Sequence, residues 1–333
     1  MYELEINRVA NEIVKRGAKR VLLQLPDGLR PEALKLVKAL KEKVEADLLL
    51  LGDSCYGACD VALRQAQAVG ADLIVHYGHS MMLPNEGIPV VYVEARVYID
   101  VTKLVELVLP LISGWRSVGL AATVQHIHQL REVARALEQR DFTVVIGPSG
   151  SRVSHDGQVL GCDYSSAVSI SEKVDGFMFV GGGRFHPLGL AISTGKPVAA
   201  ADPYQMSATE INEAEIKKLA MKRMAAITAA KAAKRFGIIV SIKPGQLQLE
   251  AARSMRSKLH ERGREAAIIC VDEVRADSFL NFSEVDAFID TACPRIALDG
   301  IADLHKPIIT QQEALVMLGE KEWTEKWLGS YLG

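Results

Sequence analysis

The 333-residue sequence lacks several features that mark particular classes of protein. Charge of one sign is not in excess, since the formal net charge is −2, so composition indicates no nucleic-acid partner. The most apolar window, residues 105–124, is interrupted by Glu106, Pro110 and Arg116 and predicts no membrane span. The opening stretch MYELEINRVANEIVKRG has the pattern of an amphipathic helix, not of a signal peptide. We therefore expect a cytoplasmic protein with no membrane partner and no direct contact with nucleic acid.

Cysteine is scarce, and familiar cysteine motifs are missing. Without a secretory signal, disulfides are not expected, and cysteines in matching positions would indicate metal or redox chemistry. No CxxC or HxxxH pair favours zinc, no CxxxCxxC indicates the familiar radical-enzyme cluster, and no GxGxxG indicates a dinucleotide. The five cysteines are Cys55, Cys59, Cys162, Cys270 and Cys293.

What the sequence does contain is one α/β pattern repeated three times. Strand-like and helix-like runs alternate from residue 20, and the alternation restarts near residues 116 and 236, which predicts parallel sheets. Asp72 follows Cys59 by 13 positions, and Asp175 follows Cys162 by the same 13. These matched spacings indicate internal repeats of about a hundred residues each.

We therefore predict an α/β protein with three repeated domains arranged around a central cluster site. The first domain, residues 1–100, contains Cys59, and the second, residues 101–205, contains Cys162. The third, residues 206–333, contains a long connecting helix, Cys293 and a C-terminal helix on which Trp323 and Trp327 share one face, suited to docking on the body or on a dimer partner.

Cys293 lies at a different point of its repeat. It follows Asp286 by seven positions, and the equivalent positions in the first two repeats are His79 and Gly182. All three still lie just beyond a strand, where open parallel sheets bind their ligands. Three such sheet edges can face one central site.

One cysteine in each repeat suggests a shared cluster. Three thiolates suit a [4Fe–4S] cluster that leaves one iron open to a ligand, because soft sulfur ligands select such clusters. From spacing alone, three unrelated buried thiols are about equally consistent with the pattern. Cys270, inside the apolar run AAIICVD, is predicted to be a buried strand thiol. Cys55 has no counterpart in the other repeats, so we predict that it is not a ligand.

Motifs spread along nearly the whole chain, in one order, carry a resemblance to a known family. They are LLQLPDGL (22–29), GDSCYGACDVA (52–62), VHYGHS (75–80), GGRFHPLGLAIST (182–194), DPY (202–204), VSIKPGQ (240–246) and DTACPRIALDG (290–300). The chain resembles the archaeal-type diphthamide biosynthesis enzymes, the 2-(3-amino-3-carboxypropyl)histidine synthases. It departs from them after Cys59, where DVAL stands in place of the second cysteine or acidic residues often present.

The resemblance implies a cluster held by Cys59, Cys162 and Cys293, and S-adenosylmethionine as second cofactor. It implies a radical reaction, different from that of the familiar radical enzymes, in which a 3-amino-3-carboxypropyl group passes to a histidine of translation elongation factor 2. A homodimer and an electron donor protein are implied as well. The alternative is a quinolinate-synthase-like condensing dehydratase that uses the open iron as a Lewis acid.

Two groups near the first strands are candidates for binding S-adenosylmethionine. Asp27 could pair with an ammonium and Arg30 with a carboxylate, although Pro-Asp-Gly is also ordinary turn chemistry. Asp53 could bind ribose hydroxyls, but capping of the next helix is the favoured interpretation.

The strand ends of the first two repeats supply further candidates. His79 is predicted to face the site because it occupies the position of Cys293. Gly182 would allow close approach of the backbone to a ligand, and Arg184 and His186 are possible contacts beside it.

Overall fold

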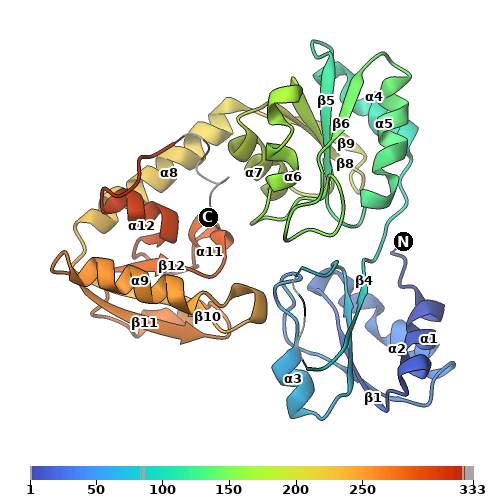
Figure 1. Ribbon diagram of the computed structural model, residues 1–333, viewed down its shortest axis with the longest axis horizontal. Helices are drawn as coiled ribbons and strands as arrows, with labels where there is room; N and C mark the ends of the chain where they lie inside the picture. Colours follow the sequence, from blue (N-terminus) through green and yellow to red (C-terminus); the bar gives the residue numbers. More distant parts are fainter. Residues whose placement is uncertain (1, 83, 85–86, 325, 327–333) are drawn as a thin grey trace.

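The computed structural model describes residues 2–82, 84, 87–324 and 326. Three sheets follow one another along the chain, and Figure 1 shows them as three units around a common centre. Their strand orders are β2-β1-β3-β4, β6-β5-β7-β8-β9 and β11-β10-β12-β13. The first four strands of each unit thus share one order and all pair in parallel, which confirms the predicted α/β class.

The first unit contains the chain from α1 to β4. Its strands are β1 (Arg20–Gln24), β2 (Asp47–Leu50), β3 (Leu73–Tyr77) and β4 (Val90–Val93). Its helices are α1 (Ile6–Arg16), the 3-10 helix η1 (Asp27–Glu32), α2 (Ala33–Lys41) and α3 (Leu63–Ala68). Buried side chains alternate along β1 between two clusters, with Val21 and Leu23 in one and Leu22 in the other, so the sheet is covered on both faces.

The second unit contains one strand more. Its strands are β5 (Ser117–Ala122), β6 (Thr143–Ile146), β7 (Gly176–Val180), β8 (Val198–Asp202) and β9 (Ser207–Ile211), the last of which is antiparallel to β8. Its helices are α4 (Val101–Val108), α5 (Leu130–Glu138), α6 (Ser165–Val168) and α7 (Phe185–Thr194), with 3-10 turns η2 (Leu109–Leu111), η3 (Ile127–Gln129) and η4 (Ser171–Lys173).

The third unit begins with the predicted connecting helix, α8 (Glu213–Lys231), which spans the second and third units in Figure 1. Its strands are β10 (Arg235–Ser241), β11 (Glu265–Val271), β12 (Ala287–Asp290) and β13 (Ile308–Thr310). Its other helices are η5 (Pro244–Gln246), α9 (Leu249–His260), α10 (Ala276–Leu280), α11 (Pro294–Asp299) and α12 (Gln311–Met317).

One aspartate performs the same task in each unit. Asp72, Asp175 and Asp286 precede β3, β7 and β12, and each carboxylate accepts hydrogen bonds from two successive backbone N–H groups at the start of the central strand. These are the aspartates on which the repeat register was based. The shared contact supports the interpretation of the sequence as three copies of one unit.

The domain boundaries at 100/101 and 205/206 remain a prediction. Because β9 pairs with β8 along Val198–Asp202, we propose that the second boundary lies after Ile211. Among the described residues, no helix is both long enough and apolar enough to cross a membrane.

Two local predictions were wrong. Cys270 is exposed, because β11 is the edge strand of its sheet and one of its faces is open to solvent. Trp323 lies beyond the end of α12 rather than on a C-terminal helix, although it does pack against the core of the third unit. Trp327 lies outside the described residues.

Candidate functional site

Cys59, Cys162 and Cys293 line a single pocket of about 210 Å³. Cys59 lies in the loop between β2 and α3, and Cys162 lies in the loop between β6 and α6. Cys293 directly precedes α11, just beyond β12. Each unit therefore contributes one thiol from the carboxyl-end side of its parallel strands, where such sheets bind ligands.

The environment of the three thiols suits a cationic centre. The pKa of Cys162 is raised to about 12, chiefly by burial and then by repulsion from the nearby Cys59 sulfur. The pKa of Cys293 is also about 12, first through burial and then through Asp290 and the other two sulfurs. Buried thiolates that repel one another are stable only beside positive charge, which iron supplies. The donor set therefore fits an iron–sulfur cluster.

The loop that carries Cys59 is fixed by its neighbour Asp60. The Asp60 carboxylate accepts hydrogen bonds from the backbone N–H of Tyr56 at 3.3 Å and from Lys243 Nζ at 2.8 Å. Both members of this ion pair have side chains only 7% exposed, and Lys243 belongs to the third unit. Gln24, at the end of β1, donates from Nε2 to the Asp60 carbonyl at 2.5 Å. Charges from two units thus set the position of the loop.

The KPGQ segment of the third unit also contacts Cys59 directly. The Gly245 N–H donates to the Cys59 carbonyl at 2.8 Å, and the Gln246 side chain donates from Nε2 to the Cys59 sulfur at 3.3 Å. A Cβ on Gly245 would lie 2.5 Å from Cys59 Cα, so only glycine fits this approach. This contact explains a motif to which the sequence alone assigned no role.

The other two cysteine loops are also held by local hydrogen bonds. Around Cys162, the backbones of Leu160 and Asp163 exchange two hydrogen bonds at 2.9 and 3.1 Å. Next to Cys293, buried Asp290 accepts from the backbone N–H groups of Ala292 at 2.8 Å and Cys293 at 3.3 Å. Each thiol is therefore presented by an ordered turn.

Two arginines that sequence reasoning missed bring positive charge to the cysteine pocket. Arg152 and Arg295 both line it, and the Arg295 guanidinium lies over the Phe185 ring at 4.6 Å from the centroid. Guanidinium groups pair with carboxylates through two parallel hydrogen bonds, so either arginine can bind an acidic ligand that enters this pocket.

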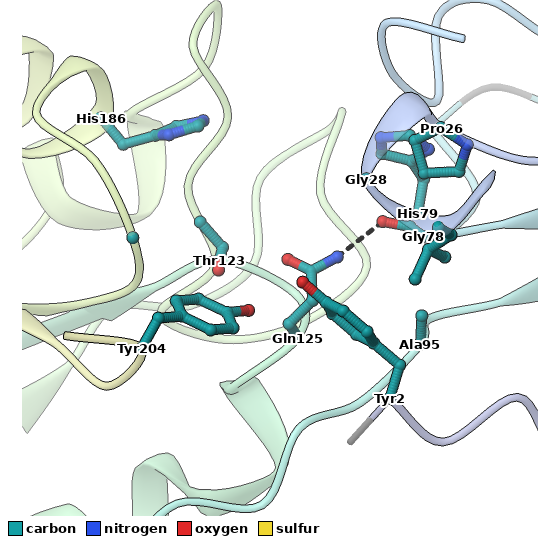
Figure 2. Close-up of a pocket in the computed structure, with 12 residues that line it drawn as sticks. Tyr2, Pro26, Gly28, Gly78, His79, Ala95, Thr123, Gln125, His186 and Tyr204 are labelled. Atoms are coloured by element: carbon teal, nitrogen blue, oxygen red, sulfur yellow. Dashed lines mark hydrogen bonds between the residues drawn. The ribbon is translucent and has the colours of Figure 1, made fainter. Parts of the chain in front are cut away.

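Figure 2 shows a second pocket, of about 340 Å³. Its lining residues are Tyr2, Pro26, Gly28, Leu29, Gly78, His79, Ala95, Thr123, Gln125, Gly182, His186 and Tyr204. Five of these, Gly78, His79, Thr123, Gln125 and His186, also line the cysteine pocket. Figure 2 shows Gly28, Gly78 and His79 of the first unit facing His186 and Tyr204 of the second. The two pockets form one connected site between units.

Of the residues predicted to bind S-adenosylmethionine, His79 and Gly182 lie in this site. His79 lines both pockets, and burial lowers its pKa to about 4 despite the opposing effect of the Tyr77 carbonyl. A Cβ on Gly182 would lie 3.0 Å from the Tyr204 ring, so glycine keeps this wall of the pocket close-fitting. His186, named beside them, also lines both pockets.

The other candidates are engaged elsewhere. Asp27 and Arg30 pair with each other at 3.2 Å, and Arg30 also donates to the Asp53 carbonyl. Arg184 donates to Thr209 Oγ1 at 2.6 Å and pairs with Glu215. None of Asp27, Arg30, Asp53 and Arg184 is among the described residues that line the two pockets, so their binding roles remain predictions.

The expectation that Asp53 caps the next helix was wrong. The next helix, α3, begins only at Leu63, after an irregular loop.

Cys55 lies with two histidines next to the site. Its sulfur and one ring nitrogen from each of His76 and His79 all lie within 4.8 Å of one another, so the group could hold a metal ion. The Cys55 sulfur lies 4.0 Å from His76 Nε2, which in turn lies 3.0 Å from His79 Nδ1. Cys55 is buried, and burial raises its pKa to about 12. It does not line the cysteine pocket, which agrees with the prediction that it is not a cluster ligand but does not test it.

A three-unit α/β protein with a cysteine from each unit at one pocket matches a known class of enzyme. The family model described as "Putative diphthamide synthesis protein" matches residues 25–328. The chain belongs to this family of diphthamide synthesis proteins.

Individual relatives agree. The chain is 41% identical to 2-(3-amino-3-carboxypropyl)histidine synthase of Pyrococcus horikoshii, over 97% of this chain and 92% of that protein. It is 30% identical to subunit 1 of the human synthase, over 100% of this chain and 76% of that one. A crystal structure of Pyrococcus horikoshii Dph2 with a 4Fe-4S cluster matches with a TM-score of 0.89 and 40% identity, over 97% and 93% of the two chains.

Proposed function

We propose that this chain transfers the 3-amino-3-carboxypropyl group of S-adenosylmethionine to a histidine of translation elongation factor 2, the first step of diphthamide biosynthesis. The observation that carries the proposal is the convergence of Cys59, Cys162 and Cys293, one from each unit, on one pocket. The names of its relatives support the same reaction, and the cluster in the Pyrococcus structure supports the cofactor.

In this proposal the three cysteines hold a [4Fe–4S] cluster and the adjoining pocket holds S-adenosylmethionine. When bound, the cluster supplies the electron that cleaves the bond from the sulfonium to the methionine γ-carbon. The task of the protein is to decide which sulfonium bond faces the open iron. The shared wall of the two pockets, which includes Gly78, Thr123 and Gln125, sets that orientation.

The lining residues suit the parts of S-adenosylmethionine. Arg152 and Arg295, at the cysteine pocket, are placed to pair with the methionine carboxylate. Tyr2 and Tyr204, with ring centroids 6.5 Å apart, offer aromatic surface for the adenine in the second pocket. The methionine arm would then lie next to the cluster and the adenosyl part away from it.

The accessory predictions follow from the proposed reaction. A reduced cluster needs an electron donor protein, and the family resemblance implies a homodimer in the cytoplasm. Elongation factor 2 is the protein substrate, whose imidazole must reach the carbon radical.

The proposal is tested by the nucleoside that the enzyme produces. Anaerobic protein, dithionite, S-adenosylmethionine and elongation factor 2 should give methylthioadenosine and a factor heavier by one aminocarboxypropyl group. The exposed Cys270→Ala serves as the control that keeps this activity. Formation of 5′-deoxyadenosine would contradict the bond assignment. An intact reduced cluster that forms neither nucleoside would favour the Lewis-acid alternative.

A further inference from the structure

A chain of hydrogen bonds behind the site fixes the orientation of the Gln24 side chain. Its Oε1 accepts from the Ala62 backbone N–H at 3.1 Å, and its Nε2 donates to the Asp60 carbonyl at 2.5 Å. If the amide were reversed, its NH2 group would face the Ala62 N–H and its oxygen would face the Asp60 carbonyl. The oxygen of Gln24 is therefore the atom that faces His76, at 2.8 Å from its Nδ1.

This orientation sets the protons of two histidines. His76 Nδ1 must carry a hydrogen in order to donate to Gln24 Oε1. His76 is fully buried, and burial keeps its pKa well below 6.5, so the ring is neutral and its Nε2 is an acceptor. That Nε2 lies 3.0 Å from His79 Nδ1, which must therefore donate to it. The remaining nitrogen of His79, Nε2, then carries a lone pair and no hydrogen.

The lone pair belongs to a residue that lies in the candidate functional site. His79 lines both the cysteine pocket and the adjoining pocket, where the reacting groups would meet. Its ring is neutral at pH 7 because its pKa is about 4. The second histidine there, His186, stacks on Phe179 and meets Phe185 edge-on, and no described side chain sets its tautomer as Gln24 and His76 set that of His79.

We propose that His79 is the catalytic base of the transfer step and that Gln24 and His76 hold it in the required tautomer. The inference rests on the proposed function. The carbon radical forms a bond to C2 of the target imidazole and leaves a radical adduct. The aromatic ring is restored when the C2 proton goes to His79 Nε2 and one electron returns to the oxidised cluster. The sum is S-adenosylmethionine and histidine giving methylthioadenosine, modified histidine and one proton.

The decisive variant is His79→Asn, whose amide can still donate to His76 but is not basic. Because cleavage precedes proton loss, the diagnostic quantity is the amount of modified factor per methylthioadenosine formed, and not the rate of methylthioadenosine formation. Modified factor per methylthioadenosine should fall by at least about tenfold, as expected when a general base is lost. Elongation factor 2 with deuterium at C2 of the target histidine should then react more slowly with the variant, whereas the parent should show little isotope effect.

His186→Asn is the matched comparison from the same pockets. Any loss of activity in this variant should leave the C2 isotope effect as small as in the parent. An unchanged ratio of modified factor to methylthioadenosine in His79→Asn, with no isotope effect, would overturn the assignment of the base. Absence of methylthioadenosine from the parent would instead contradict the proposed function, so the two failures are distinguishable.

The tautomer is measured independently of activity. In ¹⁵N-labelled protein without a cluster, His79 should show a protonated Nδ1 and an unprotonated Nε2, and Gln24→Leu should mix the two tautomers. A proton on Nε2 in the parent would overturn the inference. Stoichiometric binding of zinc or iron by a variant with alanine at Cys59, Cys162 and Cys293 would also overturn it. A metal held by Cys55, His76 and His79 would occupy Nδ1 and leave the proton on Nε2.

Discussion

A single side-chain amide of the third unit reaches the sulfur of Cys59 in the first. The bond from Gln246 Nε2 to Cys59 Sγ, 3.3 Å long, places a donor dipole on an atom proposed to bind iron. Hydrogen bonds to cluster sulfurs stabilise the reduced, more negative state and are one way in which a protein sets the reduction potential. The reduction potential of the proposed cluster thus depends on Gln246, which lies 187 positions from the proposed ligand Cys59 in the sequence.

We predict that Gln246→Leu keeps a full complement of iron but has a more negative reduction potential. The leucine fills similar space and removes the N–H donor. An anaerobic redox titration followed by electron paramagnetic resonance measures the shift. Gln139→Leu, at an exposed helix end, is the control and should keep the parent potential. Equal potentials in Gln246→Leu and parent would show that the amide does not act on the cluster.

The cysteine residues show which parts of the site the sequence could predict and which it could not. The repeat register identified Cys59, Cys162 and Cys293 as candidates, and the structure places them at one pocket. The prediction that Cys270 is buried was wrong, because an apolar run does not reveal whether its strand is central or at a sheet edge. Gln24, Gln246 and the two arginines could not be found, since their roles depend on contacts between distant segments.

At the scale of elements, an aspartate before the third strand of each unit accepts hydrogen bonds from the start of its first strand. Asp175 and Asp286 both have a pKa below the ordinary 3.8, chiefly through hydrogen bonds from backbone and side-chain donors at the start of β5 and β10. Such carboxylates stabilise the fold only when they are ionised. The sequence showed these aspartates as spacing markers, but their hydrogen bonds require the strand order, which periodicity does not give.

The pKa shift of Asp286 predicts a pH dependence. Its pKa is lowered to about 2 in the folded protein, so its contribution is complete above pH 3.8 and is lost as the pH falls through about 2. The difference in urea midpoint between parent and Asp286→Asn should therefore be constant from pH 5 to 7 and shrink below pH 4. Asp277→Asn, at an exposed position of helix α10, is the control. A difference that grows in acid would contradict the assigned contact.

At the scale of the whole molecule, the site exists only where the units meet. Within the described part of the chain, two ion pairs join the first unit to the third: buried Lys243–Asp60 and exposed Arg64–Asp272, with N–O distances of 2.8 and 2.6 Å. The sequence predicted the three units and a central site, because repeats and strand ends can be recognised locally. It could not predict which loops would touch, since packing between units leaves no periodic signal.

These two pairs should differ strongly in their effect on stability. Lys243→Met leaves the Asp60 charge buried and unpaired, which typically costs about 3–5 kcal/mol. Arg64→Ala removes an exposed pair and should cost no more than about 1 kcal/mol. Urea denaturation of the cluster-free proteins measures both. Adding Asp60→Asn to Lys243→Met should recover part of the loss, and a loss from Lys243→Met no larger than that from Arg64→Ala would refute the role of the buried pair.

The central claim is that one thiol from each unit holds a common cluster, and the most direct measurement is iron and sulfide content after anaerobic purification. The parent should contain about four iron and four sulfide per chain, as a [4Fe–4S] cluster requires. Cys55→Ala and Cys270→Ala should match it, whereas alanine at Cys59, Cys162 or Cys293 should each remove or destabilise the cluster. A full cluster in Cys293→Ala, or its loss in Cys55→Ala, would contradict this account.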